Sequence, residues 1–335
     1  MNIWVALLLL AIGFVCLVKG ADWFVDGASG IAEKLRVPPL VVGLTIVAFG
    51  TSAPELATSI ISAVQGDTGI AIGNIVGSNI TNILLILGLS ALICSLPVHK
   101  DTLRIDYPVL LGASVLLLLF GLDGTLSRFE GIFFFVVSCV YTVALIWLAI
   151  RARDKESEKG EVVEKSEHAE EEQAKTAFGK WYNQMKAFTW FLIVTTIVGL
   201  VIVVLGANLA VESATAIAEK FGVSDRIIGL TVVAIGTSLP ELVTCVVAST
   251  KGDTDIAVGD IVGSCIFNIL RTLGISATIL PLAFSTAFVI DTCVAIGAVV
   301  LLAVLSLLKG HKIRRYGGII MLAGFVAYYI YLFAI

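Results

Sequence analysis

The sequence predicts an all-α integral membrane protein whose ten transmembrane helices form two inverted five-helix repeats. Three observations support this: an apolar composition, ten apolar stretches and an internal repeat. Of the 335 residues, 58% are hydrophobic and 14% are charged, with a mean hydropathy of +1.00, whereas soluble domains carry about 25% charged residues. Stretches able to cross about 30 Å of hydrocarbon occupy residues 3–30, 38–65, 69–95, 104–122, 129–150, 187–218, 226–250, 255–280, 283–308 and 313–334.

Charge, cysteine and histidine placement exclude several other classes of protein. The formal net charge is −4, so there is no basic excess to neutralise the phosphates of a nucleic acid. The cysteines lie in apolar runs without C-x-x-C spacing, which predicts small buried side chains rather than disulfides or metal ligands; they are Cys16, Cys94, Cys139, Cys245, Cys265 and Cys293. All three histidines fall in polar connections, which argues against histidine-bound zinc or haem inside the membrane.

The first stretch has the length of a signal peptide. No small-residue cleavage site follows residues 1–18, so we expect a retained first span. Residues 151–186 form the one long polar segment, and their alternating Lys and Glu predict a solvated linker. An ion-sensing or regulatory loop is the alternative.

Basic residues are distributed unevenly between the two sides. The linker's side carries Lys34, Arg36, Lys100, Arg104, Lys251, Lys309, Lys312, Arg314 and Arg315 in its other connections, whereas the opposite side carries Arg128, Lys220 and Arg226. The positive-inside rule therefore places the linker in the cytoplasm and both termini outside.

An internal repeat recurs at an offset of 186 residues. The segment GLTIVAFGTSAPE (43–55) returns as GLTVVAIGTSLPE (229–241), and about 31 of the 51 positions in 43–93 match those in 229–279. Five spans separate equivalent points, so the second copy enters the bilayer upside down. Inverted repeats are typical of secondary transporters, whose substrate site lies near the midplane between the repeats. Duplicated packing modules without a site are the alternative, but each copy carries a carboxylate.

Glu55 and Glu241 lie within apolar spans, where an ionisable side chain costs at least about 2.5–3.5 kcal/mol. Pro54 and Pro240 precede them, and each removes a backbone N–H and clashes with the carbonyl four residues back. We therefore expect a loosened helix with free carbonyl groups at Gly50 and Gly236. Such backbone is tolerated at membrane depth where it lines a cavity or is buried in protein.

Hydroxyl and amide side chains surround these carboxylates in sequence. Each repeat offers two hydroxyls before its glutamate and a Ser/Asn pair at i and i+4, on one face of the next span; they are Thr51, Ser52, Ser78 and Asn82, then Thr237, Ser238, Ser264 and Asn268. An all-oxygen set of this kind suits hard cations such as Ca²⁺ or Na⁺. Two carboxylates balance one Ca²⁺ or two or three Na⁺, and competition for shared oxygens favours exchange because the empty charged site is costly to reorient.

The doubled motifs GTSAPE (50–55) and GTSLPE (236–241), each followed by Gly-Ser (77–78 and 263–264), resemble the two α-repeats of the sodium/calcium exchanger family. The resemblance implies that Glu55 and Glu241 ligate Ca²⁺ and Na⁺, with the hydroxyl and amide side chains above completing the cage. It also implies backbone carbonyl ligands at Ala48 and Ala234. The first and sixth spans would slide across an eight-helix core.

Several positions depart from the family pattern. Asn268 stands where some members, including K⁺-dependent ones, carry Asp, which weakens a K⁺-coupled interpretation. Proton-coupled relatives carry Gly-Asn-x-x-Glu where this chain has GNIVG (73–77) and GDIVG (259–263), which disfavours H⁺ exchange. Asp260, the counterpart of Asn74, is interpreted as a hydrogen-bonding residue at a helix end, with an additional charge near the ion path as the alternative.

Arg271 is a further departure, because its repeat partner is Leu85. A guanidinium at membrane depth needs a partner. One interpretation has it capping carbonyls or pairing with an acid outside the site. The other makes it a tethered cation that replaces a bound Na⁺ and so modulates transport.

The sequence thus favours a secondary antiporter that exports Ca²⁺ against Na⁺ entry, without a cofactor, in the plasma membrane of a prokaryote. We expect residues 1–150 and 187–335 to form the two repeats. A K⁺- or H⁺-coupled exchanger and a passive cation channel remain alternatives. A membrane hydrolase is a weaker one, since the chain has no H-E-x-x-H motif and no histidine near Ser78 or Ser264.

Overall fold

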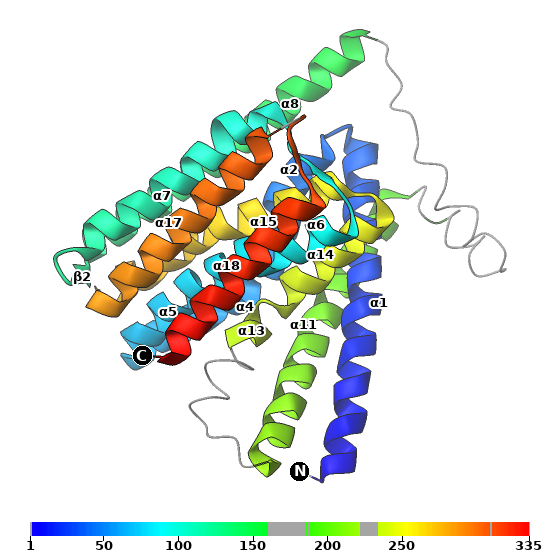
Figure 1. Ribbon diagram of the computed structural model, residues 1–335. Coiled ribbons are helices and arrows are strands. Elements are labelled where there is room, and N and C mark those ends of the chain that lie inside the picture. The colour runs from blue at the N-terminus through cyan, green and yellow to red at the C-terminus, as the bar shows by residue number, and fades with distance from the viewer. Residues whose placement is uncertain (1, 160–184, 186–187, 222–233, 309, 335) are drawn as a thin grey trace.

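The computed structural model describes residues 2–159, 185, 188–221, 234–308 and 310–334, which form a bundle of helices (Figure 1). The first half contains α1 (Ile3–Leu35), α2 (Pro39–Val42), η1 (Gly43–Val47), α3 (Ala48–Thr51), α4 (Ala53–Gln65), α5 (Thr68–Ile80), η2 (Thr81–Ile86), α6 (Leu87–Ile93), β1 (Leu96–Pro97), η3 (Thr102–Asp106), α7 (Tyr107–Gly121), β2 (Thr125–Leu126) and α8 (Arg128–Lys159). The second half contains α11 (Thr189–Lys220), α13 (Ala234–Thr237), α14 (Leu239–Lys251), α15 (Thr254–Phe267), η5 (Asn268–Leu273), α16 (Gly274–Ile279), β3 (Leu282–Ala283), α17 (Thr286–Leu307), β4 (Lys312–Ile313) and α18 (Arg315–Ala334). Segments labelled η are π-helical turns continuous with their neighbours.

Nine of the ten expected spans have counterparts in the described residues. Eight helices are long and apolar enough to cross a membrane, and the bent pair Pro39–Thr51 and Ala53–Gln65 is the ninth. The expected span 226–250 begins outside the described residues, and α13 and α14 are its described part. The first span is longer than expected, because α1 continues to Leu35 and ends where Arg36 adopts a left-handed φ of 54°.

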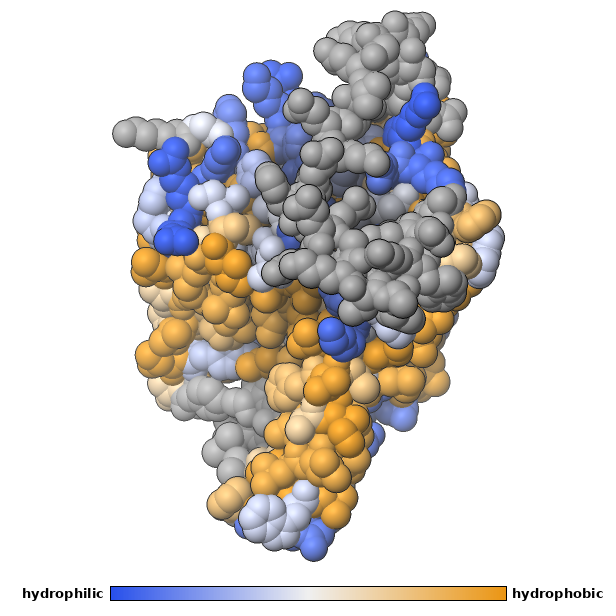
Figure 2. Space-filling view, turned by 90° about the vertical axis from the view of Figure 1, so that its right-hand side faces the viewer, coloured by the Kyte–Doolittle hydropathy of each residue, from blue (hydrophilic) through white to orange (hydrophobic). Residues whose placement is uncertain are grey.

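Apolar side chains cover the middle of the molecular face seen in Figure 2. Figure 2 shows a band of hydrophobic residues with hydrophilic residues gathered above it, as the bilayer requires. This environment corrects the expectation that all cysteines are buried. Cys245 and Cys265 are buried, but Cys139 and Cys293 are exposed on the bundle surface, and none of the six forms a disulfide. In a lipid-facing surface an apolar thiol needs no protein cover.

α1 and α11 lie side by side in antiparallel directions and project together from the rest of the bundle (Figure 1). Glycines bring their backbones together: a Cβ on Gly20 would lie 2.9 Å from the carbonyl oxygen of Gly199, and one on Gly13 would lie 3.0 Å from that of Gly206. Small residues allow this close approach where lipid offers no hydrophobic drive. Buried residues of the pair form a hydrophobic cluster separate from the main core: Leu17, Ala21, Val203, Ala207 and Ala210.

Two short strand pairs tie the halves of the chain together. β1 pairs antiparallel with β4 through Leu96 and Ile313, and β2 pairs with β3 through Leu126 and Leu282. β1 and β2 lie before and after η3 and α7, so the two pairs lie at opposite ends of this span. Each pair therefore joins a connection of the first half to one of the second half on the same side of the bundle.

The most deeply buried spans are the two that carry the predicted Ser/Asn pairs. In Thr68–Ile93, 78% of the most apolar window is buried, and in Thr254–Ile279 the value is 94%, against 17–39% for the other six. These two spans form the centre of the bundle, and the broken helices pack directly on them. Gly43, Gly259 and Gly263 allow η1 and α3 to contact the backbone of α15.

Candidate cation-binding site

The second predicted span is broken at Ser52. This residue has φ −82° and ψ 8° and separates α3 from α4, which begins at Ala53 with Pro54 in its first turn. Proline fits there because the first N–H groups of a helix have no intrahelical acceptor. Glu55 consequently lies at the positive end of the α4 dipole, which stabilises a negative charge.

The second repeat has the same break at Ser238, with φ −89° and ψ 8°. α14 begins at Leu239, and Glu241 lies in its first turn. The sequence placed the disruption at the carbonyls of Gly50 and Gly236. The break instead lies two residues later in each copy, because the proline begins a new helix.

Each site carboxylate accepts a hydrogen bond from the serine of the other repeat. Ser52 Oγ donates to Glu241 Oε1 at 2.9 Å, and Ser238 Oγ donates to Glu55 Oε1 at 3.2 Å. These two contacts are equivalent at the 186-residue offset. Ser238 Oγ also lies 3.3 Å from Ser78 Oγ, which is 3.5 Å from Glu55 Oε1. The two broken helices therefore meet head to head at their carboxylates.

Thr51 and Ser264 form a second polar group around Asp260. Thr51 Oγ1 donates to Asp260 Oδ1 at 2.9 Å and lies 3.4 Å from Ser264 Oγ. Ser264 Oγ is 3.4 Å from the carbonyl of Ala48, an expected ligand, and 3.5 Å from Asp260 Oδ1. Asp260 is fully buried inside α15, which corrects its interpretation as a helix-end residue.

Asn74 and Ser59 belong to the same network, although neither is among the ligands predicted from the sequence. Asn74 Nδ2 donates to the Glu55 carbonyl at 3.2 Å and to Ser59 Oγ at 3.0 Å, and its Oδ1 accepts from Thr237 at 3.3 Å. The predicted residue Thr237 is thus brought to the site from α13. The signal for Asn74 was available, because Asp260 is its repeat counterpart.

The predicted asparagines occupy the centre of the bundle in different ways. Asn268 Nδ2 donates to Asn79 Oδ1 at 3.1 Å, and Asn79 Nδ2 donates to the carbonyl of Cys265 at 3.1 Å. Asn79 and Cys265 are repeat counterparts that face one another, a relation that only the folded chain reveals. Asn82 is fully buried, with both polar atoms unpartnered. Ala234 begins α13.

Buried oxygens without a hydrogen-bond donor indicate what the site can bind. They include Glu55 Oε2, Glu241 Oε2, Asp260 Oδ2, Asn82 Oδ1 and Asn268 Oδ1. A buried acceptor without a partner is costly, and a cation can satisfy several at once. Within the described ranges no three Asp, Glu, His or Cys side chains stand close enough to hold a metal ion by themselves, so a bound cation needs hydroxyl, amide or carbonyl oxygens as well.

Arg271 points toward α8. Its Nε donates to Ser138 Oγ at 3.2 Å and one terminal nitrogen donates to Thr142 Oγ1 at 3.1 Å. The guanidinium carbon lies 4.6 Å from the centre of the Phe267 ring and 5.7 Å from that of Phe49. Hydroxyls and ring faces, rather than the expected carbonyls or acid, are the partners that the structure gives to this charge.

Charged residues join α1 to the core at the end of α14. Lys251 Nζ lies 2.6 Å from Asp22 Oδ1 and 2.7 Å from Asp26 Oδ1. Nearby, His99 Nε2 is 3.0 Å from Asp255 Oδ2. This hydrogen bond raises the pKa of His99 above its usual value, against the opposing effect of partial burial.

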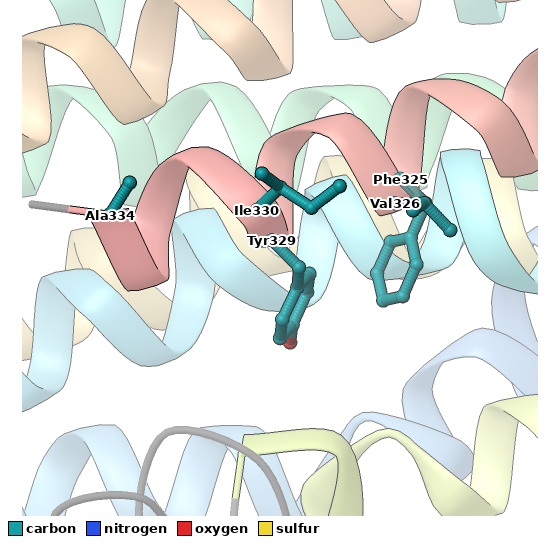
Figure 3. A pocket seen from close by; sticks show the side chains of 5 residues that line it. All are labelled: Phe325, Val326, Tyr329, Ile330 and Ala334. Atoms are coloured by element: carbon teal, nitrogen blue, oxygen red, sulfur yellow. The ribbon is translucent and has the colours of Figure 1, made fainter.

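The surface formed by the described residues carries apolar grooves. One runs along α18, where Figure 3 shows Phe325, Val326, Tyr329, Ile330 and Ala334 on the same helix. The other lies between α1, α11 and the start of α14, beside Gly236 and Leu239. Neither groove exposes the carboxylates, which are fully buried.

Comparison with known proteins finds relatives that match nearly the whole chain. The family model described as sodium/calcium exchanger protein matches residues 5–147 and 191–334. The sodium/calcium exchanger MaX1 of Methanosarcina acetivorans is 35% identical over 355 residues, covering 98% of each chain. The inner membrane protein YrbG of Escherichia coli is 35% identical over 325 residues, covering 96% of this chain and 94% of its own. A structure of the sodium-calcium exchanger NCX_Mj soaked with Na⁺ and Ca²⁺ has a TM-score of 0.79 and 29% identity, covering 96% of this chain and 97% of its own.

Proposed function

Because the chain belongs to the sodium/calcium exchanger family, and is therefore a membrane antiporter of Ca²⁺ and another cation, we propose that its coupling ion is Na⁺. Exchange takes place by alternating access to one site, and Glu55 and Glu241 are its central ligands. The observation that carries the proposal is the reciprocal pair of serine–carboxylate hydrogen bonds. In both glutamates the second carboxylate oxygen, Oε2, is fully buried and has no hydrogen-bond donor.

The chemistry of the site favours hard cations. Two carboxylates at helix N-termini provide charge, while Ser52, Ser78 and Ser238 provide neutral oxygens. Carboxylate and hydroxyl oxygens suit Ca²⁺ and Na⁺, and no cofactor is required. The other ligands are the remaining predicted residues: Thr51, Thr237, Ser264, Asn82, Asn268, and the carbonyls of Ala48 and Ala234.

Alternating access follows from an inverted-repeat architecture in which ten spans are divided between residues 1–150 and 187–335, joined by the linker 151–186. Equivalent breaks at Ser52 and Ser238, and strand pairs that each take one strand from either half, support this division. The α1–α11 pair is the moving element. It has its own hydrophobic cluster, and it crosses the two broken helices where they carry the ligands.

The membrane is a prokaryotic plasma membrane, with the linker in the cytoplasm and both termini outside. The positive-inside distribution of the short connections supports this orientation. Strand pairing is consistent with it, because Lys312 in β4 lies on the same side as Lys100, which follows β1, whereas Arg128 follows β2 at the opposite end.

Purified protein in proteoliposomes tests the function. Ca²⁺ uptake is measured with outward gradients of Na⁺, K⁺ or H⁺ in turn, and we expect uptake with the Na⁺ gradient only. Glu55→Gln and Glu241→Gln should abolish it, because each removes a charge from the site. Glu33→Gln is the matched control, since Glu33 is exposed near the end of α1. This variant should transport Ca²⁺ normally.

Each competing mechanism gives a different result in the same assay. Uptake driven by a K⁺ or H⁺ gradient would identify that ion, instead of Na⁺, as the coupling ion. Ca²⁺ flux that needs no counter-ion gradient identifies a channel. Normal transport by both glutamine variants refutes the assignment of the carboxylates.

A further inference from the structure

The charged cluster at the end of α14 holds α1 through all the donors of one lysine. Lys251 Nζ lies 2.6 Å from Asp22 Oδ1 and 2.7 Å from Asp26 Oδ1, and it also donates to the Asp22 carbonyl at 2.8 Å. An ammonium group has three donors, so α1 offers an acceptor to each of them. The three side chains are 14–27% exposed, and solvent ions screen such partly buried charges less than fully exposed ones.

The other end of the α1–α11 pair has a different set of residues at the equivalent positions. At the 186-residue offset, the counterparts of Lys251, Asp22 and Asp26 are, in this order, Gln65, Asn208 and Glu212. All three counterparts are exposed. Only the glutamate among them is charged, so this end lacks the lysine that the ion pairs require.

Packing differs between the two ends in the same sense. α1 packs along α14, whereas the equivalent elements, α11 and α4, hardly touch within the described residues. Val247 of α14 packs on the cluster of the α1–α11 pair, but its counterpart in α4, Ile61, is 54% exposed. The end of the pair that carries the N-terminus projects away from the rest of the bundle (Figure 1). The pair is therefore attached at the end where Lys251 lies.

A second contact strengthens the attachment at the same end. Ser29 Oγ of α1 donates to Asp253 Oδ1, just beyond α14, at 3.4 Å. In an inverted repeat the two halves exchange their arrangements when access to the site changes sides. The opposite access state is thus expected to have α11 packed on α4 and α1 withdrawn from α14.

We propose that Lys251, Asp22 and Asp26 form a one-sided latch that holds the pair in the state whose site faces away from the cytoplasm. The inference rests on the proposed function, from which it takes the two access states and the orientation. Turning the site toward the cytoplasm breaks the three contacts of Lys251, and Gln65 forms no ion pair in exchange. A site that faces the cytoplasm in only a fraction of the molecules binds cytoplasmic Ca²⁺ with an apparent affinity reduced by that fraction. The latch therefore restrains export until cytoplasmic Ca²⁺ rises.

Exchange of Ca²⁺ for radioactive Ca²⁺ tests the latch, because it reports access from each side and needs no Na⁺. The KM for Ca²⁺ is measured at the cytoplasmic face in inside-out membrane vesicles and at the outer face in right-side-out vesicles, with saturating Ca²⁺ on the other side. Vesicles from cells without the protein give the background. The ratio of the cytoplasmic to the outer KM follows the equilibrium between the two states.

Lys251→Gln introduces the residue that the other half carries, and we expect it to lower this ratio about tenfold, which corresponds to about 1.4 kcal/mol. Asp22→Asn combined with Asp26→Asn removes the same ion pairs from the side of α1 and should act in the same direction. Lys312→Gln is the matched control, because this lysine is exposed on the same side of the bundle. It should keep the wild-type ratio.

The latch is then rebuilt at the other end of the pair. Gln65→Lys with Asn208→Asp supplies the missing charges beside Glu212. Added to Lys251→Gln, these substitutions should lower the ratio below that of Lys251→Gln alone, because they stabilise the cytoplasm-facing state.

Three results would overturn the inference: a wild-type ratio in both latch-breaking variants, a shift toward a higher ratio, or a rebuilt latch that leaves the ratio of Lys251→Gln unchanged. Hydrogen–deuterium exchange of the Ca²⁺-bound protein is an independent measurement. Lys251→Gln should speed amide exchange where α1 meets the end of α14, and unaltered exchange there also counts against the latch. Absence of Na⁺-driven Ca²⁺ uptake in the wild type refutes the proposed function, while the KM ratio still measures the latch.

Discussion

Gly199→Ala is expected to destabilise the α1–α11 pair. An ideal Cβ at Gly199 would lie 2.5 Å from the backbone nitrogen of Phe24, 2.8 Å from the carbonyl oxygen of Gly20 and 2.9 Å from the Cα of Phe24. Ordinary contacts begin near 3.4 Å, so the axes must separate by about 1 Å. All three neighbours are backbone atoms, and no side chain can rotate away to make room.

The expected magnitude follows from overpacking, which costs roughly 1–3 kcal/mol. Alanine also favours a helix over glycine by about 1 kcal/mol, which conceals part of that cost. Gly297→Ala corrects for this, because Gly297 lies in α17 with open space around its Cβ. The difference between the two variants therefore isolates the effect of the interface.

Thermal unfolding in detergent, followed by size-exclusion chromatography, measures the difference. We expect the Gly199→Ala midpoint to lie roughly 2–6 °C below that of Gly297→Ala, at about 2 °C per kcal/mol. Equal midpoints for the two variants would refute the close packing of α1 against α11. Ca²⁺ flux should fall in Gly199→Ala only, if the pair moves as one body.

Three further predictions concern charged groups. Lys251→Met should lower stability by about 1–3 kcal/mol, because it leaves two carboxylates of α1 without their ammonium group; the exposed Lys312→Met is the control, and equal melting would exclude a structural role for the cluster. The pKa of His99 is raised in the folded state by its hydrogen bond to Asp255. The hydrogen bond therefore stabilises the fold fully at pH values below the pKa of His99 in the unfolded chain. This stabilisation is lost as the pH rises through the pKa of His99 in the folded chain. His99→Asn should remove this part of the pH dependence of the melting temperature, and an unaltered profile contradicts the assignment. Arg271→Leu removes two hydrogen bonds and should lower the free energy of unfolding by about 1–3 kcal/mol. The variant should keep the Na⁺ dependence of Ca²⁺ flux, whereas an altered dependence would establish the tethered-cation role.

Helix positions followed well from the sequence, because a bilayer imposes one length and one composition on every span. The expected stretch 69–95 is the helix Thr68–Ile93, and 104–122 is Thr102–Gly121. The family resemblance implied that the first and sixth spans form a loosely attached pair, but the glycines that bring α1 and α11 into close contact were not used, although Gly13, Gly20 and Gly27 recur every seven residues. A glycine spacing identifies a small helix face but not the partner that packs on it.

The sequence likewise predicted some residues of the candidate site and not others. Repetition of the GTSxPE motif identified Glu55 and Glu241, because a carboxylate that recurs in two apolar spans needs a chemical reason. Ser59 and Asn79 could not be found by this argument, since their repeat counterparts are the cysteines Cys245 and Cys265 and the pairs look unrelated in sequence.

The sequence alone determined that this protein is membrane-embedded, duplicated and equipped with paired carboxylates, because hydropathy and repetition are properties of the chain itself. Tertiary structure decided which oxygens meet. It brought Ser52 to Glu241 and Ser238 to Glu55, moved the helix breaks to these serines and buried Asp260 beside Thr51. Those contacts join residues 183–209 positions apart, and only the packing of one repeat against the other brings them within hydrogen-bonding distance.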